Sequence, residues 1–389
     1  MTTMSEVIYL DNSATTRVYP EVAELMCKIM TEDYGNPSSR HAKGIEAENH
    51  IKNAKSILSK LLKCTDKEIL FTSGGTESNN IALIGVCEAN KRAGNHVIVS
   101  DIEHPSVSET AKHLEELGYR VSKLPVNADG TISLDKLEQL LSEDTILVST
   151  MLVNNEIGAV APVEKMSELI KNECPNALFH VDSVQGFGKY KIYPKRMGID
   201  LLSVSGHKIH GPKGVGFLYI GDKVKVKPIV FGGGQQNGLR SGTDNVPGIA
   251  GLALAAQMIY NDFEEKQEKL YALKERLVNG LKAIPDTIIN GPEVREGAPH
   301  IVNASFLGVR SEVLLNVFAR EGICVSAGSA CSTHKQNLSP TLKAIGADAK
   351  RMDSAIRFSM CEFTTEEEID KCLEVLNKEL PMLRRFVRK

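Results

Sequence analysis

The sequence predicts an α/β protein with a large α/β/α sandwich domain, built on a mainly parallel sheet, and a smaller α+β domain. The chain has 389 residues, more than one small domain needs and enough to bury a sizeable core. Short β-type runs alternate with helical patterns through the first two thirds, which is typical of parallel βαβ units. The last third has a different order of elements and begins after a group of helix breakers.

The elements of the large domain follow from local patterns. Short β-type runs predict strands at 96–100, 145–150, 178–182 and 201–205. Apolar residues near helical spacing predict helices between these strands, at 106–117, 134–141 and 163–172. Such an alternation places the carboxyl ends of the strands beside a crevice where open α/β sheets bind ligands.

A long helical pattern at 246–283, rich in Ala, Leu, Glu and Lys, leads into the second domain. It stops at Pro285 and at Gly291-Pro292, and the remainder reads strand, helix, loop, helix, strand, helix, with the last helix at 365–380. We therefore expect a large domain at 15–260 and a small domain formed by 1–14 and 261–389.

Composition excludes several classes of protein. The formal net charge of −3 gives no general reason to bind nucleic acid or an anionic membrane. No apolar run reaches the roughly 18 residues of a membrane span, and the first ten residues lack the pattern of a signal peptide. Eight scattered cysteines include no CxxC pair, so reduced thiols and a cytoplasmic location are expected.

A turn rich in small polar residues precedes a helical run near Thr76, in the segment Phe71-Thr-Ser-Gly-Gly-Thr-Glu-Ser-Asn-Asn80. Free N–H groups at a helix start attract phosphate, and glycines allow it to approach closely. By itself, such a turn is more often only an ordinary helix cap.

Two residues at expected strand ends suggest a cofactor. Asp182 ends one strand, and Lys208 follows the end of another. Pyridoxal phosphate needs a lysine for a Schiff base and an acid that keeps its ring nitrogen protonated. Either residue alone reads as a solvated charge, but with the phosphate turn the functional interpretation is the better one. A metal site at His207 and His210 is not expected, because the HEXXH glutamate is missing.

The chain resembles the cysteine desulfurases of the NifS/IscS type, which are class-V aminotransferase-like enzymes of pyridoxal-phosphate fold type I. The resemblance runs from about residue 7 to the C-terminal helix. It rests on Tyr9-Leu-Asp-Asn-Ser-Ala-Thr-Thr16, Gly35-Asn-Pro-Ser-Ser39 with His41, the segment 71–80, Glu103-His-Pro105, Asn154-Asn-Glu-Ile-Gly158, His180-Val-Asp182, Ser205-Gly-His-Lys208, Arg240-Ser-Gly-Thr243 and Ser326-Ala-Gly-Ser-Ala-Cys331.

The resemblance implies roles for individual residues around pyridoxal 5'-phosphate. It makes Lys208 the Schiff-base lysine and Asp182 the partner of the ring nitrogen. It makes Gln185 the partner of the ring hydroxyl and His104 the imidazole stacked on the ring. The implied phosphate cup consists of Gly75, Thr76, Ser205 and His207. Thr243 would complete the cup of the neighbouring subunit, which implies a homodimer with shared active sites.

Substrate binding and sulfur transfer are implied in the same way. Asn155 and Arg357 match positions that hold the carboxylate of L-cysteine. Cys331 lies in a run of small residues that we expect to form a mobile, polar loop, where a thiolate is accessible. The other seven cysteines, including Cys324, are expected to be buried and structural.

Two departures from the family pattern leave local roles open. Gln236 stands where a glutamate is common, and Met360-Cys-Glu362 replaces a more usual Leu-Gly-Arg. Neither change removes a chemical group from the expected mechanism. The roles of Gln236, Cys361 and Glu362 are therefore left open.

The implied activity is the conversion of L-cysteine to L-alanine, with the sulfur left as a persulfide on Cys331 and His104 as acid or base for thiol protons. The sulfur acceptor is left open between an iron–sulfur scaffold protein, a tRNA-thiolation protein and a nitrogenase-dedicated partner. Selenocysteine lyase is the nearest alternative. A class-V aminotransferase would need no loop cysteine, and a non-catalytic sulfur carrier would not need Lys208, Asp182, Gln185 and His104 together.

Overall fold

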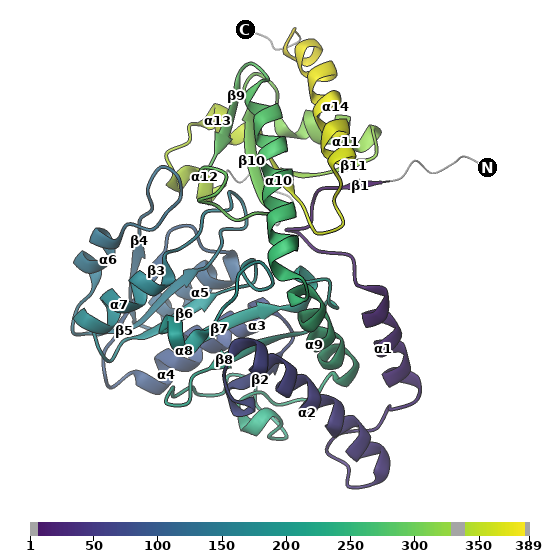
Figure 1. Ribbon diagram of the computed structural model, residues 1–389. Helices are drawn as coiled ribbons and strands as arrows, with labels where there is room; N and C mark the ends of the chain where they lie inside the picture. Colours follow the sequence, from purple (N-terminus) through teal and green to yellow (C-terminus); the bar gives the residue numbers. More distant parts are fainter. Residues whose placement is uncertain (1–6, 328–338, 386–389) are drawn as a thin grey trace.

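The computed structural model describes residues 7–327 and 339–385. Two units, each containing a β-sheet, lie one above the other along the long helix α10 (Phe263–Lys282) (Figure 1). The lower unit holds a seven-stranded sheet, and the upper unit holds a four-stranded sheet. The α/β fold class expected from the sequence is confirmed.

The seven-stranded sheet is mainly parallel, as expected. Its strands follow the order β2 (Ile69–Thr72), β8 (Gly216–Ile220), β7 (Leu201–Ser205), β6 (Leu178–Asp182), β5 (Thr145–Met151), β3 (His96–Ser100) and β4 (Arg120–Leu124). Strand β8 alone runs antiparallel to both of its neighbours in this sheet. The four strands predicted from the sequence are all present, and β5 is one residue longer than expected. Strands β6 and β7 are adjacent and parallel, so their carboxyl ends lie at the same edge.

Helices cover both faces of this sheet because successive side chains of a strand point to opposite faces. In β8, Phe217 packs into the core under one layer of helices, and Leu218 packs into the core on the other face. The first layer includes α1 (Pro20–Thr31), α2 (Ala42–Leu62), α7 (Val163–Glu173) and α9 (Val246–Tyr260). The second includes α5 (Pro105–Glu116) and the helical run of α3 (Gly75–Asn80), η2 (Ile81–Gly85) and α4 (Val86–Asn90).

Short elements complete the lower unit. They are η1 (Asp66–Glu68), α6 (Leu134–Leu140), α8 (Pro194–Met197), η3 (Gly206–Lys208) and η4 (Gln236–Gly238). The predicted helices at 106–117, 134–141 and 163–172 are confirmed as α5, α6 and α7, with ends that differ by one residue.

The upper unit has an antiparallel sheet in the order β12 (Ser326–Ala327), β13 (Ala355–Ser359), β10 (Ile301–Phe306) and β9 (Thr287–Asn290). The N-terminal strand β1 (Ile8–Tyr9) pairs with β11 (Ile323–Cys324), so both ends of the chain contribute to this unit. Its core forms between the sheet and helices α10, α11 (Ser311–Arg320) and α14 (Glu366–Arg385). Two short helices, α12 (Pro340–Ala344) and α13 (Ala349–Asp353), precede β13.

The expectation of one helix at 246–283 is wrong. Helix α9 ends at Tyr260 and α10 begins at Phe263, because Asn261 is extended and Asp262 has a left-handed φ of 51°. Aspartate tolerates this conformation better than most residues do. The break separates an apolar helix buried in the lower unit from an amphipathic helix that reaches the upper one (Figure 1).

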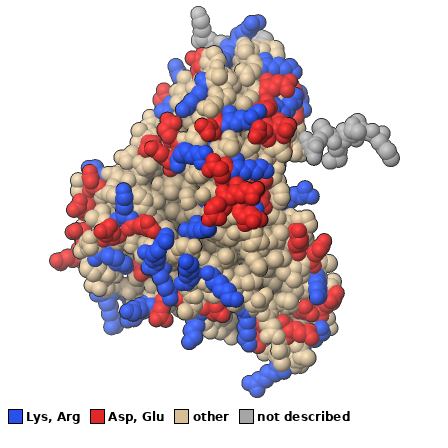
Figure 2. Space-filling model, in the orientation of Figure 1, with Lys and Arg blue, Asp and Glu red and all other residues tan. Residues whose placement is uncertain are grey.

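The surface carries mixed charge. Figure 2 shows basic and acidic side chains interspersed over the face drawn, in keeping with the small net charge. Within the described ranges, no helix combines the length and apolar character that crossing a membrane requires.

Candidate active site

A cavity of about 400 Å³ lies where the chain leaves β2 and β7. Its walls include Gly75, Thr76, Ser205 and His207, the four residues predicted for a phosphate cup. The structure thus brings together two segments that are about 130 residues apart in sequence. The other lining residues are Ala14, Thr15, Ser73, Gly74, Glu77, Lys213 and Gly214.

The start of α3 supplies donors and space for a phosphate. The amide N–H groups of Gly75, Thr76 and Glu77 have no acceptor within the part of the chain that the structure describes, as is usual for a first helical turn. A Cβ atom on Gly75 would lie 2.6 Å from Cγ2 of Val184, so a larger residue would close this wall. The cavity therefore fits an anion held by backbone groups.

His207 is held as a neutral ring at the edge of this cup. Its Nδ1 lies 3.2 Å from Oγ1 of Thr15, on the N-terminal segment. Burial, together with the charges of Lys208 and Lys213, lowers the pKa of His207 to about 4. At neutral pH the ring is therefore a polar partner without charge.

Asp182, the last residue of β6, is 4% exposed and is held from two sides. Its Oδ1 accepts a hydrogen bond from the amide of Val184 at 2.9 Å, and its Oδ2 accepts one from Nδ2 of Asn79 at 2.7 Å. Burial raises the pKa of Asp182, but both hydrogen bonds and the nearby His104 and Lys208 favour the carboxylate. The protonated pyridine nitrogen of pyridoxal phosphate would supply a counter-charge for this buried carboxylate.

Lys208 ends the short helix η3 and reaches the N-terminal segment. Its Nζ donates hydrogen bonds to the carbonyl oxygens of Ser13 and, at 2.8 Å, of Ala14. Nε2 of Gln185 also donates to the Ser13 carbonyl, at 2.9 Å. The sequence interpretation gave no role to 13–15, although this segment lies within the first family block. It forms part of the site.

His104 caps the start of α5. Its Nδ1 accepts a hydrogen bond from the amide of Ser106 at 3.1 Å and lies 2.8 Å from the Ser106 hydroxyl. Burial lowers the pKa of His104, and the positive charge of Lys208 lowers it too, whereas Asp182 opposes this shift. Hydrogen bonds through Ser106 and Asn79 link His104 to Asp182, so these two predicted side chains belong to one site.

Arg357 lies on β13 and is 5% exposed. Its Nη2 lies 2.8 Å from Oδ1 of Asp11, and its Nη1 donates to the backbone carbonyl of Asn155 at 2.9 Å. Its Nε has no hydrogen-bond partner among the described residues. The predicted pair Asn155 and Arg357 is thus in contact, although through the backbone of Asn155. Asp11 was missed because nothing local marks it as the partner of an arginine 346 residues away.

Of the predicted site residues that the structure describes, the four of the phosphate cup line this cavity, whereas Asp182, Gln185, Lys208, His104, Asn155 and Arg357 are not among its lining residues. Thr243 lies in an exposed segment before α9 and is not among the lining residues, which leaves its expected role at a neighbouring subunit untested. Cys331 lies outside the described residues.

The expectation that the remaining cysteines are buried is partly wrong. Cys87, Cys174, Cys361 and Cys372 are buried, and Cys64 is half-buried. Cys27 and Cys324 are exposed. Cys27 lies on an outward face of α1, and Cys324 lies on β11, whose two-stranded sheet leaves one face of the strand uncovered.

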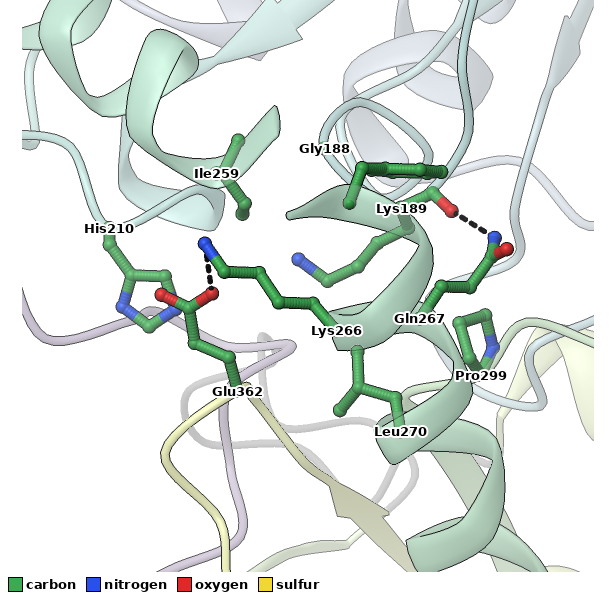
Figure 3. Close-up of a pocket in the computed structure, with 10 residues that line it drawn as sticks. Gly188, Lys189, His210, Ile259, Lys266, Gln267, Leu270, Pro299 and Glu362 are labelled. Carbon is green, nitrogen blue, oxygen red and sulfur yellow. Dashed lines mark hydrogen bonds and ion pairs between the residues drawn. The ribbon is translucent and has the colours of Figure 1, made fainter. Parts of the chain in front are cut away.

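The unusual residue Glu362 joins the two units. Its Oε1 accepts a hydrogen bond from the Tyr19 hydroxyl at 2.5 Å, and its Oε2 lies 2.8 Å from Nζ of Lys266 on α10. Figure 3 shows Lys266 and Lys189 extending towards Glu362 and His210 around a small cavity. The cavity of about 20 Å³ has room for about one water molecule. Burial lowers the pKa of Lys189 to about 8, although Cys361 and Glu362 oppose this shift.

Gln236 and Cys361, the other two residues whose roles the sequence left open, have structural contacts. Oε1 of Gln236 accepts a hydrogen bond from the amide of Phe71, and its Nε2 donates to Asp244 at 2.7 Å. Gln236 therefore ties β2 to the segment before α9. Burial raises the pKa of Cys361, so its thiol stays protonated at neutral pH and is suited to packing.

Comparison with known proteins decides the family. The model of the aminotransferase class-V family matches residues 8–372. The chain belongs to this family. It is 42% identical over 377 residues to the cysteine desulfurase IscS of Clostridium botulinum, which covers 96% of this chain and 94% of that protein. It is 40% identical over 383 residues to the mitochondrial cysteine desulfurase of Candida albicans, covering 97% of this chain and 78% of that protein.

A solved structure extends this likeness to the whole fold. A NifS-like protein superposes with a TM-score of 0.91 at 39% identity, over 97% of this chain and all of that chain. The resemblance to NifS/IscS-type enzymes and the assignment to pyridoxal-phosphate fold type I are therefore confirmed. Pyridoxal 5'-phosphate is the cofactor of this class-V group. The amide donors at α3, the buried carboxylate of Asp182 and the amine of Lys208 fit its phosphate, ring nitrogen and aldehyde.

Proposed function

We propose that this protein is a cysteine desulfurase that converts L-cysteine to L-alanine and transfers the sulfur to its own Cys331. The observation that carries the proposal is the placement of Asp182 and Lys208 at the ends of adjacent strands, beside a cavity that fits a phosphate. Full-length relatives named cysteine desulfurase support the choice of reaction. The assembled site also argues against a non-catalytic sulfur carrier.

Several side chains would hold the cofactor. The turn Gly75–Thr76, Ser205 and His207 would bind its phosphate, Asp182 its ring nitrogen and Gln185 its ring hydroxyl, with His104 stacked on the ring. When bound, pyridoxal 5'-phosphate supplies an aldehyde that captures an amine and a ring that withdraws electrons from the substrate Cα. Lys208 would hold the cofactor covalently at rest.

The remaining residues would act on the substrate. Arg357 and Asn155 would bind the carboxylate of L-cysteine, and Lys208 would move the proton at its Cα. The Cys331 thiolate would then attack the substrate sulfur: a sulfur–sulfur bond forms and the Cβ–S bond breaks. The products are a persulfide on Cys331 and, after protonation of the carbon skeleton, L-alanine.

The assembly and partners belong to the same proposal. The exposed Thr243 supports a homodimer in which each subunit completes the other's phosphate cup. The persulfide would pass to an iron–sulfur scaffold or another sulfur-acceptor protein, and neither nucleic acid nor a membrane is a proposed partner. We propose a cytoplasmic location, where thiols stay reduced, in keeping with the unpaired cysteines of the described residues.

The domain division at 15–260, with 1–14 and 261–389 as the second domain, also remains a proposal. Two observations support it. Leu10 packs with residues of α10, β10 and α14 in one core, whereas the helices before Tyr260 pack in the cores of the seven-stranded sheet. The chain also breaks its helix at Asn261 and Asp262.

Incubation of the purified protein, loaded with pyridoxal 5'-phosphate, with L-cysteine tests the function. Alanine and protein-bound persulfide should form in equal amounts in the first turnover. Alanine formation that depends on an added 2-oxo acid would indicate an aminotransferase instead. A parallel incubation with selenocysteine tests the lyase alternative, which no contact among the described residues favours over the desulfurase.

A further inference from the structure

The helix cap at α5 determines where His104 carries its proton. The backbone N–H of Ser106 points at Nδ1 of His104, with the two nitrogens 3.1 Å apart. A backbone amide can only donate, so Nδ1 must be the acceptor and can hold no proton. A neutral imidazole then carries its single proton on Nε2.

A second set of contacts enforces the same arrangement. Nδ2 of Asn79 donates one hydrogen to Oδ2 of Asp182 at 2.7 Å and the other to Oγ of Ser106 at 2.8 Å. The Ser106 hydroxyl, which accepts from Asn79, has its own hydrogen left for Nδ1 of His104, 2.8 Å away. Asn79 is completely buried, so water does not offer it alternative partners.

The direction of these hydrogen bonds depends on the orientation of the side-chain amide of Asn79. With the amide reversed, its oxygen would face the carboxylate of Asp182, and two acceptors would meet without a hydrogen. An ionised Asp182, which the proposed function requires, therefore orients Asn79, and Asn79 orients Ser106. Four residues from β6, α3 and α5 thus form one directed hydrogen-bond chain.

We propose that Asn79 and Ser106 are positioning residues that hold His104 as a neutral ring with its proton on Nε2. The ring then offers the active site a hydrogen-bond donor in the resting enzyme. It can accept a proton only after Nδ1 has lost its contacts with Ser106 or after Nε2 has given its proton away. This deepens the proposed function and rests on it for the role of His104, because it makes His104 an acid before it can be a base.

Protonation of Nδ1 is opposed from several sides. It would place an N–H group against the amide N–H of Ser106, which can only donate, and would require the Ser106 hydroxyl to turn round and accept. Burial and Lys208 also disfavour a charged His104, and Asp182 is the group that favours it. The neutral ring is the state that satisfies the neighbours.

The tautomer can be measured in the cofactor-free protein by NMR with ¹⁵N-labelled histidine. His104→Gln identifies the His104 signals among those of the 10 histidines. We expect an unprotonated Nδ1 and a protonated Nε2 at neutral pH. A proton on Nδ1 of His104 would overturn the proposal, whatever the activity of the enzyme.

The same signals test the two positioning residues. Ser106→Ala removes one donor to Nδ1, so the pKa of His104 should rise by about one pH unit, as expected for one lost hydrogen bond. Asn79→Ala should raise it by a smaller amount, because the Ser106 hydroxyl becomes free to turn away. Ser108→Ala, on the same helix, is the matched control and should leave the titration unchanged. Equal titrations in Ser106→Ala and Ser108→Ala would refute the role of Ser106.

A cap with only a structural role would lower the melting temperature without moving this titration. Failure of the proposed function is separable as well. If NMR shows the expected tautomer but the enzyme makes no alanine from cysteine, the inferred hydrogen-bond chain stands. The desulfurase assignment is then wrong.

Discussion

Arg357 forms an ion pair with Asp11, with Nη2 and Oδ1 2.8 Å apart. Asp11 lies just after β1, and its backbone bridges to Ser359 two residues beyond Arg357. The pair therefore holds the guanidinium in place beside Asn155. Nε is buried and has no partner among the described residues.

Arg357→Lys should raise the KM for L-cysteine by roughly 10- to 100-fold, because a charge-assisted hydrogen bond contributes about 1.5–3 kcal/mol. A lysine cannot contact both Asp11 and the Asn155 carbonyl while offering a fork to a carboxylate. The rate of alanine formation over a range of cysteine concentrations measures this. Arg351→Lys is the control, because Arg351 binds Asn290 in the upper unit. An unchanged KM in Arg357→Lys would exclude Arg357 from substrate binding.

Cys331→Ser should separate binding from sulfur transfer. The hydroxyl is close in size but is not appreciably ionised at neutral pH and is a poor nucleophile towards sulfur. Cysteine should still shift the cofactor absorbance, whereas persulfide and alanine should nearly disappear. Cys361→Ser is the control, because Cys361 is buried and burial keeps its thiol protonated. Full activity of Cys331→Ser would mean that another group accepts the sulfur.

Thr243 should act on the partner subunit. In mixed dimers that carry Thr243→Ala and Lys208→Ala together in one subunit, the only site with a lysine, in the unchanged subunit, lacks its phosphate threonine. We expect weaker retention of pyridoxal 5'-phosphate at that site than in dimers that carry the two changes in different subunits, where the site with the lysine receives an unchanged threonine. Equilibrium dialysis of the two kinds of dimer measures the difference, and equal retention would show that Thr243 does not act across the interface.

Glu362→Gln should lower the free energy of unfolding by about 1–3 kcal/mol, because it weakens the hydrogen bond from Tyr19 and leaves Lys266 without its counter-charge. Denaturation by urea measures this loss. Glu366→Gln is the control: its ion pair with Arg276 is exposed, and its loss should change stability little. If the two variants were equally stable, Glu362 would not join the two units.

Stability should fall in mild acid partly because of His210. Burial lowers its pKa to about 4, below the ordinary value of about 6.5, so the unfolded chain binds more protons between these two values. The contribution is complete above pH 6.5 and is lost progressively as the pH falls to 4, by up to about 3 kcal/mol.

His210→Asn tests this contribution because asparagine tolerates the left-handed φ of 61° at this position. The variant should lose less stability than the unchanged protein between pH 7 and pH 4.5. Urea denaturation at the two pH values measures the difference. His113→Asn, at an exposed position on α5, should behave like the unchanged protein. If His210→Asn also lost as much stability as the unchanged protein, His210 would not titrate as inferred.

The sequence by itself determined the α/β class, the four buried strands that it predicted and the positions of Asp182 and Lys208 at strand ends. These features depend on local periodicity and on residues close together in the chain, which a single sequence displays directly. The break at Asn261 and Asp262 was missed as a helix end because apolar spacing continues on both sides of it. The exposure of Cys324 was missed because what packs against the two-stranded sheet of β1 and β11 is not a local property of the sequence.

Only the tertiary structure decided which groups meet. Asn79 reaches Asp182 across 103 residues, and Arg357 reaches Asp11 across 346, and no spacing rule connects either pair. The position of the His104 proton is in part a tertiary property. It depends on a local helix cap, the amide of Ser106, and on the direction that Asn79 gives to the Ser106 hydroxyl, which is set by an Asp182 that only the folded chain brings into place.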